Sequence, residues 1–274
     1  LGGGALHDMP AALPSIVEIL HAGSLIVDDI EDGSTTRRGA PALHHLVGMP
    51  TALNTGNWMY FWPFLLIDRL ELPEERKARI TREAMRAVER CHRGQALDLA
   101  LTVTSLQKSE VVKVVRATTR LKTASLMELA AVIGAIAAGA KEPDIQALRR
   151  FARSLGDGLQ MLDDLGSIVS PSRAHKGRED LVHQRPTWPW AWLAMSCGEF
   201  EYQSFVEQLG RVRTGELAPA GLAESMCAAI GASGRERVHS SLQLSLAGLW
   251  GHFGERTIIQ RIQLEIERLE KSYE

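Results

Sequence analysis

The chain has 274 residues, of which 45% are hydrophobic and 23% charged, which is enough to bury a large core in a globular fold. Its formal net charge of -2 argues against a nucleic-acid-binding module, which depends on a strongly basic surface. The apolar runs are short and interrupted by glycine, so we expect no transmembrane segment. Three widely spaced cysteines without a CxxC pair, Cys91, Cys197 and Cys227, predict buried thiols in a reducing, cytoplasmic compartment.

Helical periodicity dominates the chain. Apolar residues recur at helical spacing, for example at Ile16, Leu20 and Val27, whereas alternating strand patterns are almost absent. Prolines fall between the periodic segments, where they start or stop helices. The predicted helices are residues 12–29, 50–69, 73–104, 108–119, 121–139, 143–168, 187–198, 200–210, 219–231 and 235–272. We therefore expect an all-α fold in a single domain over residues 1–274, with two polar loops at 31–48 and 170–186.

The first strong helix ends in a cluster of acidic residues, Asp28, Asp29, Glu31 and Asp32. Asp28 and Asp32 are four residues apart, so both carboxylates project from one face of the helix. Such a pair suits Mg²⁺, which prefers oxygen ligands, keeps several waters and completes its octahedron with substrate phosphates. A solvated acidic helix end is the alternative.

A second acidic cluster ends the predicted helix 143–168. Gln160, Asp163, Asp164 and Ser167 follow the i, i+3, i+4, i+7 spacing, which gathers them into a polar stripe opposite the apolar one. One Asp-Asp pair alone is weak evidence for a metal. Two such pairs, each at the end of an apolar helix, predict a multi-metal site that grips a diphosphate between two helices.

Two arginines follow the first cluster within six residues, Arg37 and Arg38, in a turn shaped by Gly39. Arginine forks recognise phosphate oxygens through two parallel hydrogen bonds. Acid for metal and arginine for phosphate, a few residues apart, is the combination that diphosphate chemistry needs. The alternative is that both arginines form internal salt bridges to Glu31 and Asp32.

The first acidic segment resembles the first aspartate-rich motif of the trans-isoprenyl diphosphate synthases, also called polyprenyl synthetases, and looks most like the geranylgeranyl diphosphate synthases of the eukaryotic type. The likeness continues in order along about 160 residues. The matching segments are His21 to Ser34 with Arg37 to Pro41, Asn54 to Phe61, His92 to Asp98, Lys122-Thr123, Gln160 to Asp164, and Glu179 to Leu181.

The resemblance implies an isoprenoid-synthase bundle of antiparallel helices around a central active-site cavity. It also implies a prenyl transfer in which an allylic diphosphate is condensed with isopentenyl diphosphate. Its implied cofactor is Mg²⁺, held by Asp28, Asp32 and Asp163. Asp29 and Asp164 would support these ligands as part of the same catalytic set.

Substrate-binding roles are carried over position by position. The allylic diphosphate would be held by Arg37, Lys122, Thr123 and Gln160, with Lys176 as a further cation and Lys122 also counted as catalytic. Isopentenyl diphosphate would be held by Arg38 and His21. The family has Glu-Gly-Lys where this chain has His183-Gln184-Arg185, so Arg185 would replace a lysine with a fork on a different stem.

One further segment of the family pattern, Gly-Lys-x-x-Arg on an earlier helix, has no counterpart before His21. We expect that this chain begins after that segment, and a real loss is the alternative. The second aspartate motif ends in Ser167 instead of a third aspartate, as in the eukaryotic-type relatives.

Product length in this family depends on how far the growing tail descends before it meets a bulky side chain. Gly23 and Ser24 are small and lie one turn before Asp28, about 5.4 Å deeper along the helix. The next barrier by resemblance is formed by Tyr60, Phe61 and His92. We therefore expect a twenty-carbon product, geranylgeranyl diphosphate, although Trp58 and Trp62 add bulk that favours a fifteen-carbon product.

Two other functions fit the same scaffold. A terpene cyclase ionises an allylic diphosphate without adding isopentenyl diphosphate, but it usually lacks the paired arginines and the Lys-Thr motif. A non-catalytic partner subunit of a prenyltransferase tends to lose aspartates, and here all five remain. Family members commonly form dimers, so we expect a homodimer.

Overall fold

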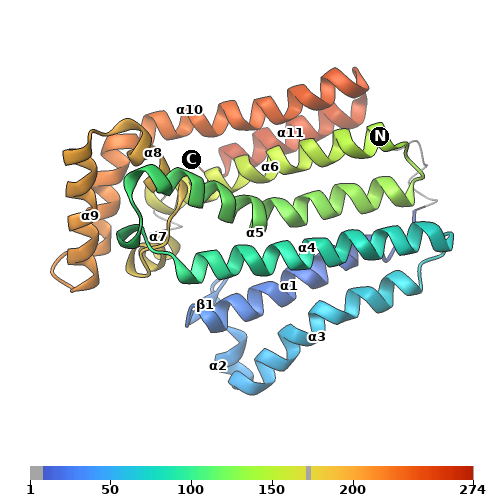
Figure 1. Ribbon diagram of the computed structural model, residues 1–274, viewed down its shortest axis with the longest axis horizontal. Coiled ribbons are helices and arrows are strands. Elements are labelled where there is room, and N and C mark those ends of the chain that lie inside the picture. The colour runs from blue at the N-terminus through green and yellow to red at the C-terminus, as the bar shows by residue number, and fades with distance from the viewer. Residues whose placement is uncertain (1–8, 171–173, 274) are drawn as a thin grey trace. The chain divides into compact units, whose positions relative to one another are not determined.

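The computed structural model describes residues 9–170 and 174–273, without the side chains of residues 174–176. Regular structure in this part of the chain is almost entirely helical, which confirms the expected all-α fold (Figure 1). A short antiparallel hairpin, β1 (Thr36–Arg37) and β2 (Ala40–Pro41), is the one sheet there. None of the described helices is both long and apolar enough to cross a membrane.

The chain forms two compact units. The first comprises Leu1–Glu89 and Glu128–Leu148, and the second comprises Arg90–Met127 and Arg149–Glu274. Residues of both units occur in each of the long helices α4 (Glu74–Ala100), α5 (Lys108–Ala137) and α6 (Glu142–Val169). The expectation of a single domain stays a prediction.

In the first unit, α1 (Leu13–Glu31) packs along α3 (Met49–Asp68), and the short α2 (Leu43–Val47) precedes α3 (Figure 1). The two long helices approach closely because glycines lie at their contact. A Cβ atom on Gly23 would lie 2.7 Å from Cβ of Met59, and one on Gly56 would lie 2.8 Å from Cγ2 of Val27. This contact fixes the helix that carries the first acidic cluster.

In the second unit, α10 (Pro219–Phe253) packs against four shorter helices: α7 (Ala174–Val182), α8 (Trp188–Ser196), α9 (Glu199–Arg213) and α11 (Thr257–Lys271). A 3-10 turn, η2 (Val103–Ser105), contacts α9. The core of the unit contains three tryptophans of α8, each at most 3% exposed: Trp188, Trp190 and Trp192. Burying these large rings stabilises the unit, because an aromatic side chain removes more apolar area from water than any aliphatic one.

Several expected helix limits are wrong. The break at residue 120 is absent, because Arg120 is a good helix former and α5 continues through it. The break at residues 232–234 is also absent. Gly234 is needed there for packing, since a Cβ atom would lie 3.0 Å from the Trp192 ring, and the helix ends instead at Gly254, where φ is +67°. The expected loop 170–186 contains α7.

The cysteines also differ from expectation. All three are free thiols and all are half-buried instead of fully buried. Desolvation raises the pKa of the Cys91 thiol to about 11, so the thiol is protonated and unreactive at neutral pH.

Candidate functional site

The first acidic cluster occupies the last turn of α1. The Asp29 carbonyl accepts a hydrogen bond from the Ser34 backbone N–H at 2.9 Å, and the intervening Gly33 has a φ of +64°. This is the Schellman ending of a helix, in which glycine supplies the left-handed residue. It stops α1 directly after Asp32 and turns the chain back toward the helix.

The β1–β2 hairpin follows and returns an arginine to the cluster. Its two loop residues, Arg38 and Gly39, have φ values of +53° and +80°, as a type I′ turn requires. Arg37 Nε donates to Asp29 Oδ1 at 2.8 Å, and its Nη2 lies 3.7 Å from Asp28 Oδ2. Arg37 thus forms internal salt bridges with Asp29 and Asp28, whereas the alternative named Glu31 and Asp32 as partners.

The two neighbouring aspartates of this cluster differ in exposure. Asp29 is 3% exposed, so its charge must be compensated inside the protein, and Arg37 compensates it. The side chain of Asp28 is 23% exposed. Asp28 is therefore the member of the pair that solvent or a ligand reaches, whereas Asp29 fixes the position of Arg37.

His21 lies one to two turns before the cluster and is half-buried. Desolvation lowers the pKa of its imidazole, and Arg38 and Arg37 lower it further, while Glu18 and Asp28 act in the opposite direction. The neutral ring is favoured, so His21 offers one N–H donor without adding charge. The electrostatic effect of Arg38 on His21 places these two predicted ligands of isopentenyl diphosphate in one neighbourhood.

The second cluster, in the second unit, is built around Asp164, which is 5% exposed. Its Oδ1 accepts from Gln160 Nε2 at 2.6 Å, and its Oδ2 accepts from the Trp188 backbone N–H at 2.9 Å. The side-chain oxygen of Gln160, Oε1, accepts in turn from the Thr123 hydroxyl at 2.5 Å. Thr187, the N-cap residue before α8, gives no side-chain cap, so Asp164 supplies the acceptor and the negative charge that a helix N-terminus favours.

Asp163, the neighbour of Asp164, is half-buried. The Tyr273 hydroxyl lies 3.4 Å from Asp163 Oδ1, so the residues after α11 reach the second cluster. Tyr273 was not predicted from the sequence, because no local pattern connects residues 110 positions apart.

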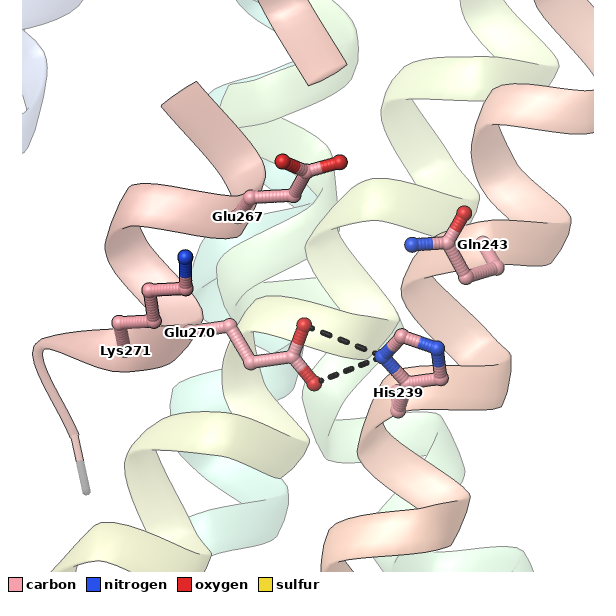
Figure 2. Close-up of a pocket in the computed structure, with 5 residues that line it drawn as sticks. All are labelled: His239, Gln243, Glu267, Glu270 and Lys271. Atoms are coloured by element: carbon pink, nitrogen blue, oxygen red, sulfur yellow. Dashed lines mark hydrogen bonds and ion pairs between the residues drawn. The ribbon is translucent and has the colours of Figure 1, made fainter. Parts of the chain in front are cut away.

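A surface pocket of about 310 Å³ lies between α10 and α11, and Figure 2 shows the side chains that line it. Its five labelled side chains come from these two helices, and His239 Nδ1 lies 3.1 Å from Glu270 Oε1. None of the side chains that line it belongs to the motifs of the sequence analysis: His239, Gln243, Glu267, Glu270 and Lys271. The pocket is therefore not the candidate site.

Two predicted phosphate-binding cations of the second unit meet at Asp98. Lys122 Nζ lies 2.8 Å from Asp98 Oδ2, and Arg185 Nη1 donates to the Asp98 backbone carbonyl. Asp98 ends the sequence motif His92 to Asp98, but no role was predicted for it. The Lys122–Asp98 and Thr123–Gln160 contacts are adjacent along α5, because Lys122 and Thr123 are consecutive.

Arg185 is directed to this place by the end of α7. The Arg185 backbone N–H bonds the Asp180 carbonyl at 2.8 Å, and the Gln184 N–H bonds the Leu181 carbonyl at 3.1 Å. Gln184 has a φ of +58°, which completes a second Schellman ending with a residue other than glycine. Family members have a glycine where this chain has Gln184, and the left-handed backbone conformation explains why glycine suits this position. The Lys176 side chain lies outside the described residues.

The positions predicted to control chain length have unequal surroundings. Gly23 is buried against Met59, so its lack of a side chain serves helix packing. Ser24 is half-buried, and its hydroxyl donates to the His21 carbonyl at 2.8 Å. Tyr60 is half-buried, whereas Phe61 is 64% exposed and His92 is exposed. The chain-length roles of these five residues stay predictions.

Mg²⁺ needs hard oxygen donors. Among the described residues, no three His, Cys, Asp or Glu side chains are gathered into a metal centre. Protein sites for Mg²⁺ commonly supply one or two carboxylates, with waters and phosphates as the other ligands. Asp28 and Asp32 at the end of α1 offer hard oxygen donors of the kind that the ion prefers, and in the second unit Asp163 of α6 offers another.

Comparison with known proteins agrees with these features. Residues 6–215 match the Polyprenyl synthetase family. The heterodimeric geranylgeranyl pyrophosphate synthase large subunit 2 of Arabidopsis thaliana is 34% identical over 174 residues, which cover 60% of this chain and 44% of that protein. Geranylgeranyl pyrophosphate synthase 6, mitochondrial, of the same plant is 33% identical over 199 residues, covering 69% and 59%. The chain thus spans about half the length of these relatives.

Among solved structures, a decaprenyl diphosphate synthase from Rhodobacter capsulatus superposes with a TM-score of 0.78. The match covers 99% of this chain and 81% of that chain, at 22% sequence identity. At this identity the likeness concerns the fold. The expected architecture of a prenyl synthase is therefore confirmed.

Proposed function

Because this chain belongs to the polyprenyl synthetase family, we propose that it is a prenyltransferase that condenses an allylic diphosphate with isopentenyl diphosphate. The observation that carries the proposal is the first acidic cluster with its hairpin. There, a partly exposed carboxylate, Asp28, lies 3.7 Å from the Arg37 guanidinium, and Arg38 is exposed at the next position. A carboxylate for a metal beside two forks for phosphate oxygens suits a diphosphate substrate.

The two substrates of the proposed reaction would be bound by different sets of residues. Arg37, Lys122, Thr123 and Gln160 would bind the allylic diphosphate, and cations at these places stabilise the charge that develops on the leaving group. Arg38 and His21 would bind isopentenyl diphosphate, whose double bond attacks the allylic carbocation. The condensed carbocation then loses a proton to the released diphosphate, so no serine nucleophile or histidine dyad is needed.

Mg²⁺ would be held by Asp28, Asp32 and Asp163, where it would supply additional positive charge to the leaving diphosphate. Asp29 and Asp164 act through other residues. The first holds Arg37, and the second holds Gln160 and the start of α8. Their buried hydrogen bonds keep these groups in place before substrate binds.

The experiment that tests the proposal is incubation of the protein with Mg²⁺, isopentenyl diphosphate and one allylic primer at a time, with products identified by mass. Dimethylallyl, geranyl and farnesyl diphosphates are the primers. Products lengthened by five-carbon units are expected. A hydrocarbon formed without isopentenyl diphosphate would identify a terpene cyclase instead, and no turnover with any primer would identify a partner subunit.

The two substrate subsites are tested separately. Arg38→Ala and His21→Ala should weaken isopentenyl diphosphate binding, whereas Arg37→Ala and Lys122→Ala should weaken allylic binding. A charge-assisted contact contributes about 1.5–3 kcal/mol, or roughly ten- to a hundredfold in affinity. Equal effects on both substrates would show that the subsites are misassigned.

We propose geranylgeranyl diphosphate as the product. Ser24 supports this, because a small, half-buried residue lies one turn before Asp28. Ser24→Phe should shorten the main product, Ser24→Ala is the matched control that should not, and Tyr60→Ala or Phe61→Ala should lengthen it. An unchanged product from Ser24→Phe would show that the tail does not pass this turn.

We also propose a cytoplasmic homodimer. Three free thiols favour a reducing compartment. The α3 helix exposes several large apolar side chains, among them Trp58 at 52%, Phe61 at 64% and Leu65 at 47%, and a second copy of the chain would cover them. Sedimentation as a monomer at micromolar concentration would contradict the dimer.

A further inference from the structure

Asp98 lies in the last turn of α4 and joins two cations that come from distant parts of the sequence. Its carboxylate contacts Lys122 of α5 at 2.8 Å, and its backbone carbonyl accepts a hydrogen bond from Arg185, which follows α7. All three residues belong to the second unit. The two contacts use different atoms of Asp98, so one residue holds both cations at once.

The end of α4 explains why its carbonyl attracts an arginine. The last four carbonyls of a helix have no partner inside the helix, and they carry the negative end of its dipole. The Leu97 carbonyl accepts from the Leu101 N–H at 3.1 Å, and the Asp98 carbonyl accepts from Arg185. The last turn of α4 contains no basic residue of its own, so Arg185 supplies the positive charge from elsewhere in the chain.

Helix α4 also fixes the stem of Lys122. A Cβ atom on Gly94, one turn before Asp98, would lie 2.8 Å from Lys122 Cγ, so the lysine side chain crosses α4 at the glycine. Cys91 Sγ lies 3.5 Å from the Lys122 carbonyl oxygen. The Lys122 and Asp98 side chains are only 29% and 17% exposed. Lys122 is therefore held along its whole length, unlike an ordinary surface lysine.

We propose that Asp98 is a positioning residue of the proposed prenyl transfer: it holds Lys122 and Arg185 as a pair of cations for the diphosphate group. The inference rests on the proposed function. By sharing the charge of Lys122, the carboxylate weakens diphosphate binding while it aims the ammonium group. This arrangement favours correct placement of the substrate diphosphate and release of the inorganic diphosphate that the reaction produces.

The test compares Asp98→Asn with the unchanged protein, because asparagine keeps the size and the backbone carbonyl of Asp98 but removes its charge. Calorimetric titration with inorganic diphosphate and Mg²⁺ should show a dissociation constant lower by roughly two- to fivefold, the effect of one partly exposed charge pair. The kcat with an allylic primer and isopentenyl diphosphate should fall by about tenfold or more, because Lys122 is no longer aimed. Tighter diphosphate binding with slower turnover is a combination that damage to the fold does not give.

Two control variants separate charge from position. Asp98→Glu keeps the charge but displaces it, so kcat should fall without tighter diphosphate binding. Glu142→Gln, in α6, removes the carboxylate that pairs with Arg79 of α4. This variant should change neither diphosphate affinity nor kcat. Weaker diphosphate binding in Asp98→Asn, or unchanged binding and kcat, would overturn the inference. If the protein without any substitution elongated no primer, that result would instead overturn the proposed function.

Discussion

The two Asp-Asp pairs follow one pattern in different surroundings. In each pair the first aspartate, Asp28 or Asp163, is partly accessible, and the second, Asp29 or Asp164, is buried. The buried members differ in what compensates their charge. Asp29 contacts a guanidinium eight residues away, whereas Asp164 accepts hydrogen bonds from a side-chain amide and a backbone N–H.

This difference teaches how the two clusters are built. The contacts of Arg37 with Asp28 and Asp29 lie within one continuous segment, from His21 to Pro41, because a helix ending and a tight hairpin fold it back on itself. The second is assembled from α4, α5, α6 and the start of α8, so its geometry depends on packing between distant segments. In both, the buried aspartate fixes neighbouring groups, whereas the first aspartate of the pair stays partly accessible.

The largest expected effect concerns the accessible aspartates. Asp28→Ala and Asp163→Ala should each lower turnover by at least about a hundredfold, the loss typical when a group that stabilises transition-state charge is removed. The melting temperature should change little, because neither residue is part of the core. Asp68→Ala, an exposed acid at the end of α3, is the control and should leave turnover intact. Near-normal turnover in either motif variant would contradict the metal assignment.

The buried aspartates should show the reverse, a loss of stability that differs between the two clusters. Asp164→Asn places its amide N–H₂ against one of the two donors that Asp164 now accepts from, the Gln160 amide and the Trp188 N–H. This loss should lower the free energy of unfolding by about 2–3 kcal/mol. Asp29→Asn should cost only about 1 kcal/mol, because its arginine partner is 36% exposed and can be hydrated. Urea unfolding measures both, and the opposite order would break the comparison.

The contrast also explains what the sequence predicts. The contacts of Arg37 with Asp29 and Asp28 are local, so residue spacing identified the acids, the arginines and the turn of the first cluster. The second cluster was recognised by composition, but its pairings were not, because Lys122 meets Asp98 across 24 residues and Arg185 meets it across 87. Local spacing carries no information on such contacts. For the same reason α10 was expected to break at Gly234, whose role depends on Trp192.

A third prediction concerns the glycine behind the first cluster. Gly23→Ala should lower the free energy of unfolding by about 1–3 kcal/mol, because the new methyl group overlaps Met59 and the Gly56 carbonyl. Gly248→Ala is the matched control in α10. Nothing lies within 4 Å of a Cβ atom there, so alanine should stabilise the helix by about 0.5–1 kcal/mol. A stabilising Gly23→Ala would show that α1 and α3 are not held in close contact.

The smallest expected effect separates stability from binding at a single residue of the first cluster. Arg38 has a φ of +53° at the hairpin tip, a conformation that costs a residue with a Cβ atom about 1 kcal/mol or more. Arg38→Gly should therefore raise the free energy of unfolding by about that amount, whereas Arg38→Ala keeps the Cβ atom and should not. Both variants remove the guanidinium, so both should weaken isopentenyl diphosphate binding equally.

Arg185, whose side chain holds the end of α4, should behave differently, because Arg185→Met removes a structural contact together with the charge and should lower both stability and diphosphate affinity. If Arg38→Gly also lowered stability, the arginine would have a structural role like that of Arg185, and the distinction between a locally built and a distantly assembled cluster would not extend to their cations.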